Sequence, residues 1–311
     1  MPAGRLSFIL LCAWRTCEQL GKLPHGGAIL IRMNRRAFLP VLAGAAALSA
    51  QDEQPVKRKG RLKQCVTGGV FGRGRSLEDT ARDAARLGAK GYDLIGPKDW
   101  PILKKYGLLP TMVPGYGGTI SDALNRTENH DRIEKLMHEG IDVCAAYGAP
   151  NLITFSGNRR GMSDAEGADN CVKFLNKVKA HAEDKGVTIC MELLNSKVNH
   201  KDYMNDHTAW GADVCKRVSS PRVKLLYDIY HLQIMEGDIV RTIKDNFQYI
   251  AHFHTGGNPG RHEIDGTQEL NYRFVAQSIA DLGFTGYVAH EYSPVRDPLK
   301  SLNEAMEIFD V

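Results

Sequence analysis

Two neighbouring stretches, KLLYDIYHLQIMEGD (224–238) and YIAHFHTGGNPGRHEID (249–265), decide the fold. Each begins with an apolar run as long as a β-strand and ends in residues that bind metals or transfer protons. Asp228 and His231 follow the first run, and His252 and His254 close the second. Such residues at the carboxyl ends of successive strands are typical of the open face of a parallel barrel.

Strand-like and helix-like patterns alternate along the rest of the chain. Eight runs have the length and character of strands: 65–67, 91–96, 109–113, 150–155, 187–194, 223–228, 249–254 and 286–292. The intervening segments repeat apolar residues at helical spacing. Eight such units in about 250 residues predict an α/β fold, a single-domain (β/α)₈ TIM barrel. A doubly wound sheet is the alternative, but the first loop, GGVFGRG (68–74), lacks the GxGxxG spacing of its nucleotide sites.

The first fifty residues differ from the rest. Arg35 and Arg36 precede the apolar run VLAGAAALSA (41–50), which predicts a secretory signal of the twin-arginine type. The run is shorter than the ~20 residues needed to span a membrane. We therefore expect a leader over 1–50 with its start at Met33, a linker over 51–61 and a catalytic barrel over 62–311. The expected location is the periplasm or another exported compartment, reached through the twin-arginine machinery.

The charge balance changes once the leader is set aside. Residues 1–50 contain six of the 40 Lys and Arg residues and one of the 36 Asp and Glu residues. The rest therefore holds 34 basic and 35 acidic residues, a formal net charge of −1. A near-neutral chain does not favour nucleic acid as a partner.

Five of the seven cysteines lie after residue 50, scattered and without a CxxC pair. Their odd number and spacing argue against a disulfide framework and predict small buried side chains. These cysteines are Cys65, Cys144, Cys171, Cys190 and Cys215.

Four consecutive predicted strands end in metal-ligand residues: Glu192, Asp228, His254 and Glu291. A single glutamate at a strand end is usually a salt-bridge or capping residue, and a single histidine is usually a hydrogen-bonded core residue. Four ligand types at four successive strand ends favour one divalent cation instead. Three carboxylates and an imidazole suit Mn²⁺, Mg²⁺, Co²⁺ or Zn²⁺. His252 lies two residues before His254 on the same strand face, one layer deeper, where a core or supporting role is expected.

The loop after His254 reads GGNPGRHEID (256–265). Its glycines and proline predict a tight turn that presents Arg261, His262 and Glu263 over the barrel mouth. A solvated surface turn is one interpretation. The other is an arginine that binds substrate oxygens or stabilises an oxyanion.

These parts together predict a reaction. A cation that chelates a carbonyl and its neighbouring hydroxyl group acidifies the proton between them. Glu192 and Glu291, on opposite walls, can remove that proton and return it elsewhere. We therefore expect an isomerase or epimerase of a small hydroxy-carbonyl compound or sugar that works through an enediolate. A keto-sugar or inosose-type dehydratase and a non-catalytic exported sugar-binding protein are the alternatives.

The chain resembles the hydroxypyruvate isomerase-like group of the xylose isomerase-like TIM-barrel sugar isomerases and epimerases. The resemblance extends over residues 62–311 and is carried by MELLNSKVNH (191–200), LLYDIYHLQIMEGD (225–238), HFHTGGNPGRHEIDGTQELNY (252–272) and GYVAHEYSP (286–294). It implies one divalent metal ion and two glutamates that both bind it and transfer the proton. By position it makes Glu192, Asp228, His254 and Glu291 the metal ligands.

The same resemblance implies that His231 and Arg261 contact substrate oxygens. A histidine at position 254 is more similar to the ketose 3-epimerases, whereas PGRHE and ELNY are more similar to hydroxypyruvate isomerases. The superfamily also includes apurinic-site endonucleases with several zinc ions, which the single ligand set and the charge balance disfavour. A homo-oligomer, in which a second subunit covers the barrel mouth, is left open.

Overall fold

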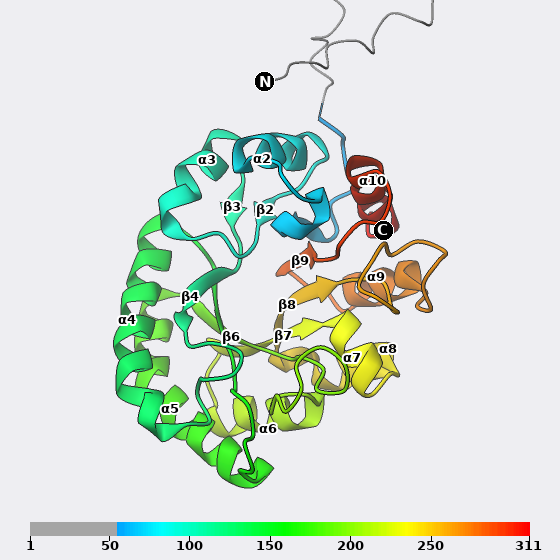
Figure 1. Ribbon diagram of the computed structural model, residues 1–311. Coiled ribbons are helices and arrows are strands. Elements are labelled where there is room, and N and C mark those ends of the chain that lie inside the picture. Colours follow the sequence, from blue (N-terminus) through cyan, green and yellow to red (C-terminus); the bar gives the residue numbers. More distant parts are fainter. Residues whose placement is uncertain (1–54) are drawn as a thin grey trace, which may run out of the picture. The chain divides into compact units, whose positions relative to one another are not determined.

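The strands of the computed structural model, which describes residues 55–311, form one parallel sheet that curls into a nearly closed barrel (Figure 1). Its order is β3-β2-β1-β9-β8-β7-β6-β5-β4. The strands are β1 (Lys63–Val66), β2 (Gly91–Tyr92), β3 (Leu109–Pro110), β4 (Val113–Gly117), β5 (Asn151–Thr154), β6 (Thr188–Glu192), β7 (Val223–Asp228), β8 (Ile250–Thr255) and β9 (Tyr287–His290). This confirms the predicted barrel.

Helices follow the strands and cover the outside of the barrel (Figure 1). The α-helices are α2 (Leu77–Arg86), α3 (Trp100–Lys105), α4 (His130–Tyr147), α5 (Asp164–Lys185), α6 (Thr208–Val218), α7 (Ile229–Met235), α8 (Ile239–Asn246), α9 (Tyr272–Asp281) and α10 (Pro298–Ile308). Short 3₁₀ helices are η1 (Gly68–Phe71), η2 (Pro97–Asp99), η3 (Thr127–Asn129) and η4 (Phe247–Tyr249). The helices bury the outer face of the strands, and side chains inside the barrel bury the inner face.

The third barrel strand is divided, which the sequence pattern did not predict. The expected strand over 109–113 is replaced by β3, which pairs with β2, and β4, which pairs with β5. Pro110 and Pro114 each remove a backbone N–H, so an unbroken ladder cannot run through this region. Met112, between β3 and β4, accepts at its carbonyl from the amide of Leu94 at 2.8 Å.

The barrel interior contains an apolar layer beneath its open end. Met112, Ile153, Cys190 and Leu226 form a buried cluster that is separate from the main strand–helix core. Since strand residues two apart share a face, Cys190 lies beneath Glu192 and Leu226 beneath Asp228. The polar ends of β6 and β7 therefore rest on packed apolar side chains.

The five cysteines after residue 50 are all buried and free, which confirms the expectation from their spacing. The predicted leader, its signal sequence and the first part of the predicted linker lie outside the described residues. From residue 55 on, the predicted linker contacts the barrel: the amide of Val56 donates to Arg86 O at 2.8 Å, and Arg58 donates to Asn303 Oδ1 at 2.6 Å. Within residues 55–311, none of the helices combines the length and the apolar character required of a membrane span.

The helix layer packs closely on the sheet at Gly140 of α4. A methyl group at this position would lie 2.4 Å from Cγ of Tyr116 in β4 and 2.7 Å from Cδ1 of Leu152 in β5. Alanine is normally the better helix former, but overpacking here outweighs that gain. We expect Gly140→Ala to lower the free energy of unfolding by about 1–3 kcal/mol in urea titrations. Glu139→Ala, at the exposed neighbour, should change it by less than about 0.5 kcal/mol.

Candidate active site

Four side chains from adjacent strands converge at the open end of the barrel. Glu192 ends β6, Asp228 ends β7, His254 lies near the end of β8 and Glu291 directly follows β9. Each offers one ligand atom, and these atoms lie within 4.8 Å of one another. We refer to these four residues as the metal cup. Sequence reasoning named all four, and the fold brings all four together.

His254 is at the centre of the metal cup. Its Nδ1 lies 2.7 Å from Glu291 Oε2, 3.3 Å from Glu192 Oε1 and 4.0 Å from Asp228 Oδ2. Despite these short distances, Nδ1 is buried and has no hydrogen-bond partner of adequate geometry among the described residues. Carboxylate oxygens therefore surround a ring nitrogen that does not donate to them.

Local structure holds each strand end in place. One oxygen of Asp228 caps α7, since Oδ1 accepts from the amide of His231 at 3.2 Å, and the other oxygen remains directed to the metal cup. The backbone carbonyl of Glu192 accepts from Tyr203 Oη at 2.8 Å and from Asn205 Nδ2 at 2.9 Å. The amide of Glu291 donates to Thr255 O at 2.9 Å, which continues the ladder past β9.

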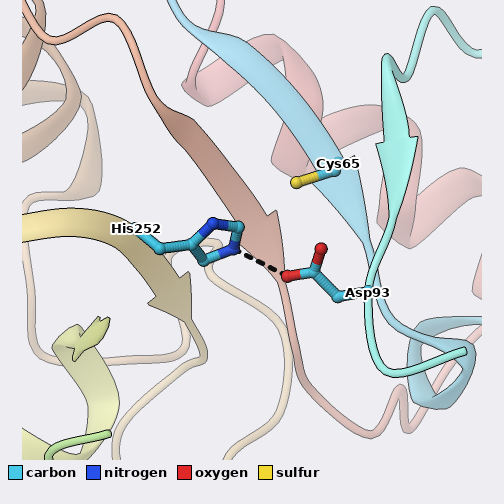
Figure 2. A group of neighbouring side chains, drawn as sticks. All are labelled: Cys65, Asp93 and His252. Carbon is cyan, nitrogen blue, oxygen red and sulfur yellow. Dashed lines mark hydrogen bonds and ion pairs between the residues drawn. The ribbon is translucent and has the colours of Figure 1, made fainter. Parts of the chain in front are cut away.

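Asp93 is a buried carboxylate beside the metal cup that sequence reasoning missed. It follows β2 and is fully buried, and its Oδ2 accepts from His252 Nε2 at 2.7 Å and from His254 Nε2 at 3.1 Å. Figure 2 shows the His252 ring and the Asp93 carboxylate facing each other, with Cys65 beside them. Asp93 lies inside the predicted strand over 91–96, whereas the structure ends β2 at Tyr92 and so places the carboxylate at the strand end.

The protons around His254 can be assigned from this contact. An ionised carboxylate only accepts, so His254 Nε2 must carry a proton. Nδ1 is then the ring nitrogen that can hold either a second proton or a cation. Burial lowers the pKa of His254, but Glu291, Asp93 and Glu192 outweigh burial and raise this pKa well above its usual value. The site therefore attracts positive charge at Nδ1, and three carboxylates with one imidazole fit a divalent cation.

The two glutamates have different environments. Burial raises the pKa of Glu192, and the nearby His254 ring only partly offsets that shift. Burial acts the same way on Glu291, but His254 and Arg261 reverse it and lower the pKa of Glu291 below its usual range. Paired carboxyl groups whose pKa values are pushed apart are suited to act as acid and base.

Arg261 extends from the loop after β8 into the site. Its Nη2 donates to Asp228 Oδ2 at 2.5 Å and to Glu291 Oε2 at 2.6 Å, and its Nε donates to Glu291 O at 3.1 Å. Its backbone has φ 56°, in the left-handed region. Gly257 permits this turn, because a Cβ there would lie 2.0 Å from the carbonyl oxygen of Glu263.

The other two residues expected over the barrel mouth have different roles. Glu263 is buried and its Oε1 accepts from the amide of Val295 at 3.0 Å and that of Arg296 at 3.3 Å. A ring nitrogen of His262, Nδ1, lies 2.9 Å from Ser293 O. Both residues tie the Arg261 loop to the segment after β9. Because Glu263 is buried, the expectation that all three residues face the mouth is wrong for Glu263.

His231 lies beneath Arg261 and is fully buried. Asn195 Nδ2 approaches its Nδ1 at 2.6 Å, and Arg261 Nη1 approaches its Nε2 at 2.6 Å. Burial and the charge of Arg261 lower the pKa of His231 well below its usual value, so the ring is neutral. A neutral imidazole has one acceptor nitrogen, and it can therefore accept from only one of these two donors.

A cavity with two lobes opens beside the metal cup. The first lobe, of about 420 Å³, is lined by Thr67, Gly68, Gly69, Asp93, Leu94, Ile95, Arg261, Glu291, Tyr292 and Ser293. The second, of about 320 Å³, has an apolar wall that includes Pro114, Ile120, Phe155 and Leu194 and a polar wall of Glu192, His200, His231, Arg261 and Glu291. Leu94, Arg261 and Glu291 line both lobes. Lobes of this size suit a small organic substrate.

Comparison with known proteins identifies the family to which this barrel belongs. The chain belongs to the xylose isomerase-like TIM barrel family, which matches residues 101–310. Over 107 residues it is 36% identical to the putative hydroxypyruvate isomerase of Xenopus laevis, covering 34% of this chain and 39% of that protein. Over 84 residues it is 38% identical to the 2-oxo-tetronate isomerase of Cupriavidus necator, covering 27% and 32%. These alignments span less than half the length of the relatives.

A longer match is weaker in identity. The 2-oxo-tetronate isomerase of Haemophilus influenzae is 27% identical over 236 residues, which cover 72% of this chain and 91% of that protein. Among solved structures, one named AP endonuclease, family 2, from Brucella melitensis has a TM-score of 0.70 at 22% identity and covers 78% of this chain and 96% of that one. D-Psicose 3-epimerase with D-tagatose from Clostridium cellulolyticum H10 has 0.66 at 17%, covering 80% and 100%. The structural matches establish the shared fold.

Removing one carboxylate from the metal cup should strongly weaken cation binding. We expect Asp228→Asn to weaken binding of Mn²⁺ or Co²⁺ by more than about 100-fold, beyond the 10–100-fold typical of residues that only support a ligand. Asp206→Asn is the matched control, because Asp206 is also buried and paired with an arginine, Arg159, at 3.0 Å. Calorimetric titration of metal-stripped protein measures both. Equal affinities in the two variants would contradict a cation site at Asp228.

Proposed function

We propose that this protein is an isomerase or epimerase of a small hydroxy-carbonyl compound or sugar, dependent on one divalent cation. The observation that supports this most directly is the pair of glutamates, Glu192 and Glu291. Both approach the same histidine nitrogen, at 3.3 Å and 2.7 Å, and both line the second lobe of the cavity. A substrate in this lobe would lie against two carboxylates that differ in pKa.

The metal cup would hold the cation through Glu192, Asp228, His254 and Glu291. Mn²⁺, Mg²⁺, Co²⁺ and Zn²⁺ are all compatible with this donor set. When bound, such a cation polarises a carbonyl group and makes the neighbouring C–H more acidic. Side chains of the protein carry out the proton transfers and bind the substrate oxygens.

Glu291 is the more readily ionised carboxylate of the pair. Its pKa is lowered by His254 and Arg261 despite burial, so it is ionised, whereas burial raises the pKa of Glu192. We assign to this pair the removal of the proton next to the carbonyl group by one carboxylate and the return of a proton to the enediolate by the other. The same residues in exchanged roles would carry the reverse reaction.

Arg261 and His231 contact substrate oxygens in this proposal. Arg261 lines both lobes and carries a permanent positive charge, so it can stabilise the oxygen that becomes negative in the enediolate. His231 lines the second lobe and is neutral, so its ring can exchange hydrogen bonds with a hydroxyl group without changing the charge of the site.

The relatives support the reaction class. Proteins named hydroxypyruvate isomerase and 2-oxo-tetronate isomerase match in sequence, and a protein named D-psicose 3-epimerase matches in fold. The substrate is accordingly sought among hydroxypyruvate, related oxo-acids and ketoses. Export by the twin-arginine route, with the periplasm as location, is a separate proposal that rests on Arg35, Arg36 and the apolar run after them.

Solvent exchange tests the reaction directly. Protein loaded with Mn²⁺ and incubated in D₂O with hydroxypyruvate, 2-oxo-tetronate or a ketose should incorporate deuterium next to the carbonyl group, seen by ¹H NMR or mass spectrometry. Glu291→Gln and Glu192→Gln should each slow incorporation by at least about 100-fold, because each removes an acid–base group. Glu269→Gln is the control, since Glu269 is exposed and bonded to Gln233.

Other outcomes distinguish the alternatives. Deuterium exchange accompanied by an ultraviolet-absorbing enone would indicate a dehydratase. Sugar binding by the parent protein without exchange of any substrate in the panel would indicate a binding protein and would contradict the proposed reaction. Full activity in both glutamine variants would refute the assignment of the acid–base pair.

A further inference from the structure

Beneath the metal cup lies a buried hydrogen-bond network that ends on one carboxylate. Asp93 Oδ2 accepts from Nε2 of both His252 and His254, at 2.7 Å and 3.1 Å, and Asp93 Oδ1 accepts from the hydroxyl group of Thr111. The side chains of Asp93, His252 and His254 have no exposed surface. Three donors thus converge on a charge that water does not reach.

The direction of every proton in this network is consistent. Asn151 Nδ2 donates to Thr111 O at 2.9 Å and approaches His252 Nδ1 at 3.5 Å, so His252 Nδ1 is the acceptor nitrogen of its ring. His252 Nε2 therefore carries the proton that Asp93 accepts. His254 must do the same, because the same oxygen faces its Nε2. Each ring consequently has its proton on Nε2.

We propose that Asp93 is the positioning residue of the metal cup: by accepting from His254 Nε2 it fixes the ring so that Nδ1 faces the oxygens of Glu192, Asp228 and Glu291. The inference rests on the proposed cation site and extends it to a residue outside the four ligands. A carboxylate behind a ligand histidine fixes both its tautomer and its orientation and makes its free nitrogen a better donor.

His252 has a supporting role in this arrangement. It lies two residues before His254 on the same face of β8, with the two ring centroids 5.4 Å apart and the planes at 82°. Its hydrogen bond to Asp93 is the shorter of the two, so His252 and Thr111 hold the carboxylate while His254 is held by it. This explains why a second histidine lies below the first without reaching the metal cup.

The same side chains could be interpreted as a second metal site, since Cys65, Asp93 and His252 also have ligand atoms within 4.8 Å of one another. Figure 2 shows their arrangement. A cation there would have to break the 2.7 Å bond between Asp93 and His252 and leave His254 Nε2 without its acceptor. Of the three residues, only Asp93 lines the described cavity. The network is already satisfied without a cation.

The test compares Asp93→Asn with Asp83→Asn in full-length protein. Asp83 is a buried carboxylate on α2. It forms ion pairs with Arg75 at 2.5 Å and Arg86 at 3.9 Å, and neither arginine belongs to the network. Asparagine keeps the shape of Asp93 but removes its charge and offers an N–H to one of the histidines. We expect Asp93→Asn to weaken Co²⁺ binding by 10–100-fold and to change the visible absorption spectrum of bound Co²⁺. Asp83→Asn should leave both unchanged.

The outcomes separate this inference from the proposed function. A parent protein that binds no divalent cation would contradict the proposed function itself. A parent that binds one cation while Asp93→Asn binds it with the same affinity and spectrum would overturn the positioning role alone. Two cations per parent chain, reduced to one by Cys65→Ala, would show that the deeper group binds metal and would also overturn it.

A second variant covers the case in which Asp93→Asn does not fold. Thr111→Val removes the hydroxyl donor to Asp93 Oδ1 but keeps the charge of Asp93 and its contact with His254. The carboxylate then keeps its two histidine donors but loses the third, so Co²⁺ affinity should fall several-fold, with the same kind of spectral change as Asp93→Asn. An unchanged affinity and spectrum in a folded Thr111→Val protein would contradict the proposal.

Discussion

The structure of the site depends on the approach of three carboxylates to one buried imidazole. Glu192, Asp228 and Glu291 lie around His254 Nδ1, and two of their oxygens come within 3.3 Å of it. Like charges this close repel one another strongly in an interior that screens poorly, so positive charge must lie among them. Arg261 supplies part of this positive charge through its ion pairs with Asp228 and Glu291. The raised pKa of His254 indicates that Nδ1 attracts further positive charge.

The barrel makes this arrangement possible by its alternation. On β6, β7 and β8 the residues two positions before the cup ligands are Cys190, Leu226 and His252, and all three are buried. Two of them are apolar and pack together, whereas the third is held by Asp93. The layer below the site is therefore apolar under the carboxylates and polar under the histidine, which is the one ligand whose second nitrogen needs a partner.

The sequence predicted site residues correctly where a metal-ligand residue type stands at the end of a predicted strand. Glu192, Asp228, His254 and Glu291 could all be found this way, because parallel strands bring their carboxyl ends to one rim. Asp93 satisfies the same rule but was overlooked, because the predicted strand continued to Gly96 whereas β2 ends at Tyr92. The division of the third strand and the inward turn of Glu263 depend on missing amide donors and on loop contacts with Val295, which no periodicity records.

The charge of the cavity bears on which chemistry the site can support. Arg261 is the only lysine or arginine among the residues that line the two lobes, and Asp93, Glu192 and Glu291 also line them. Burial lowers the pKa of His200 and of His231, so neither adds positive charge. A substrate that is neutral at its reacting carbons meets little repulsion on entry and becomes negative only as its proton leaves. Arg261 then faces a charge absent from the ground state, and an interaction that strengthens in this order accelerates a reaction instead of only binding its substrate.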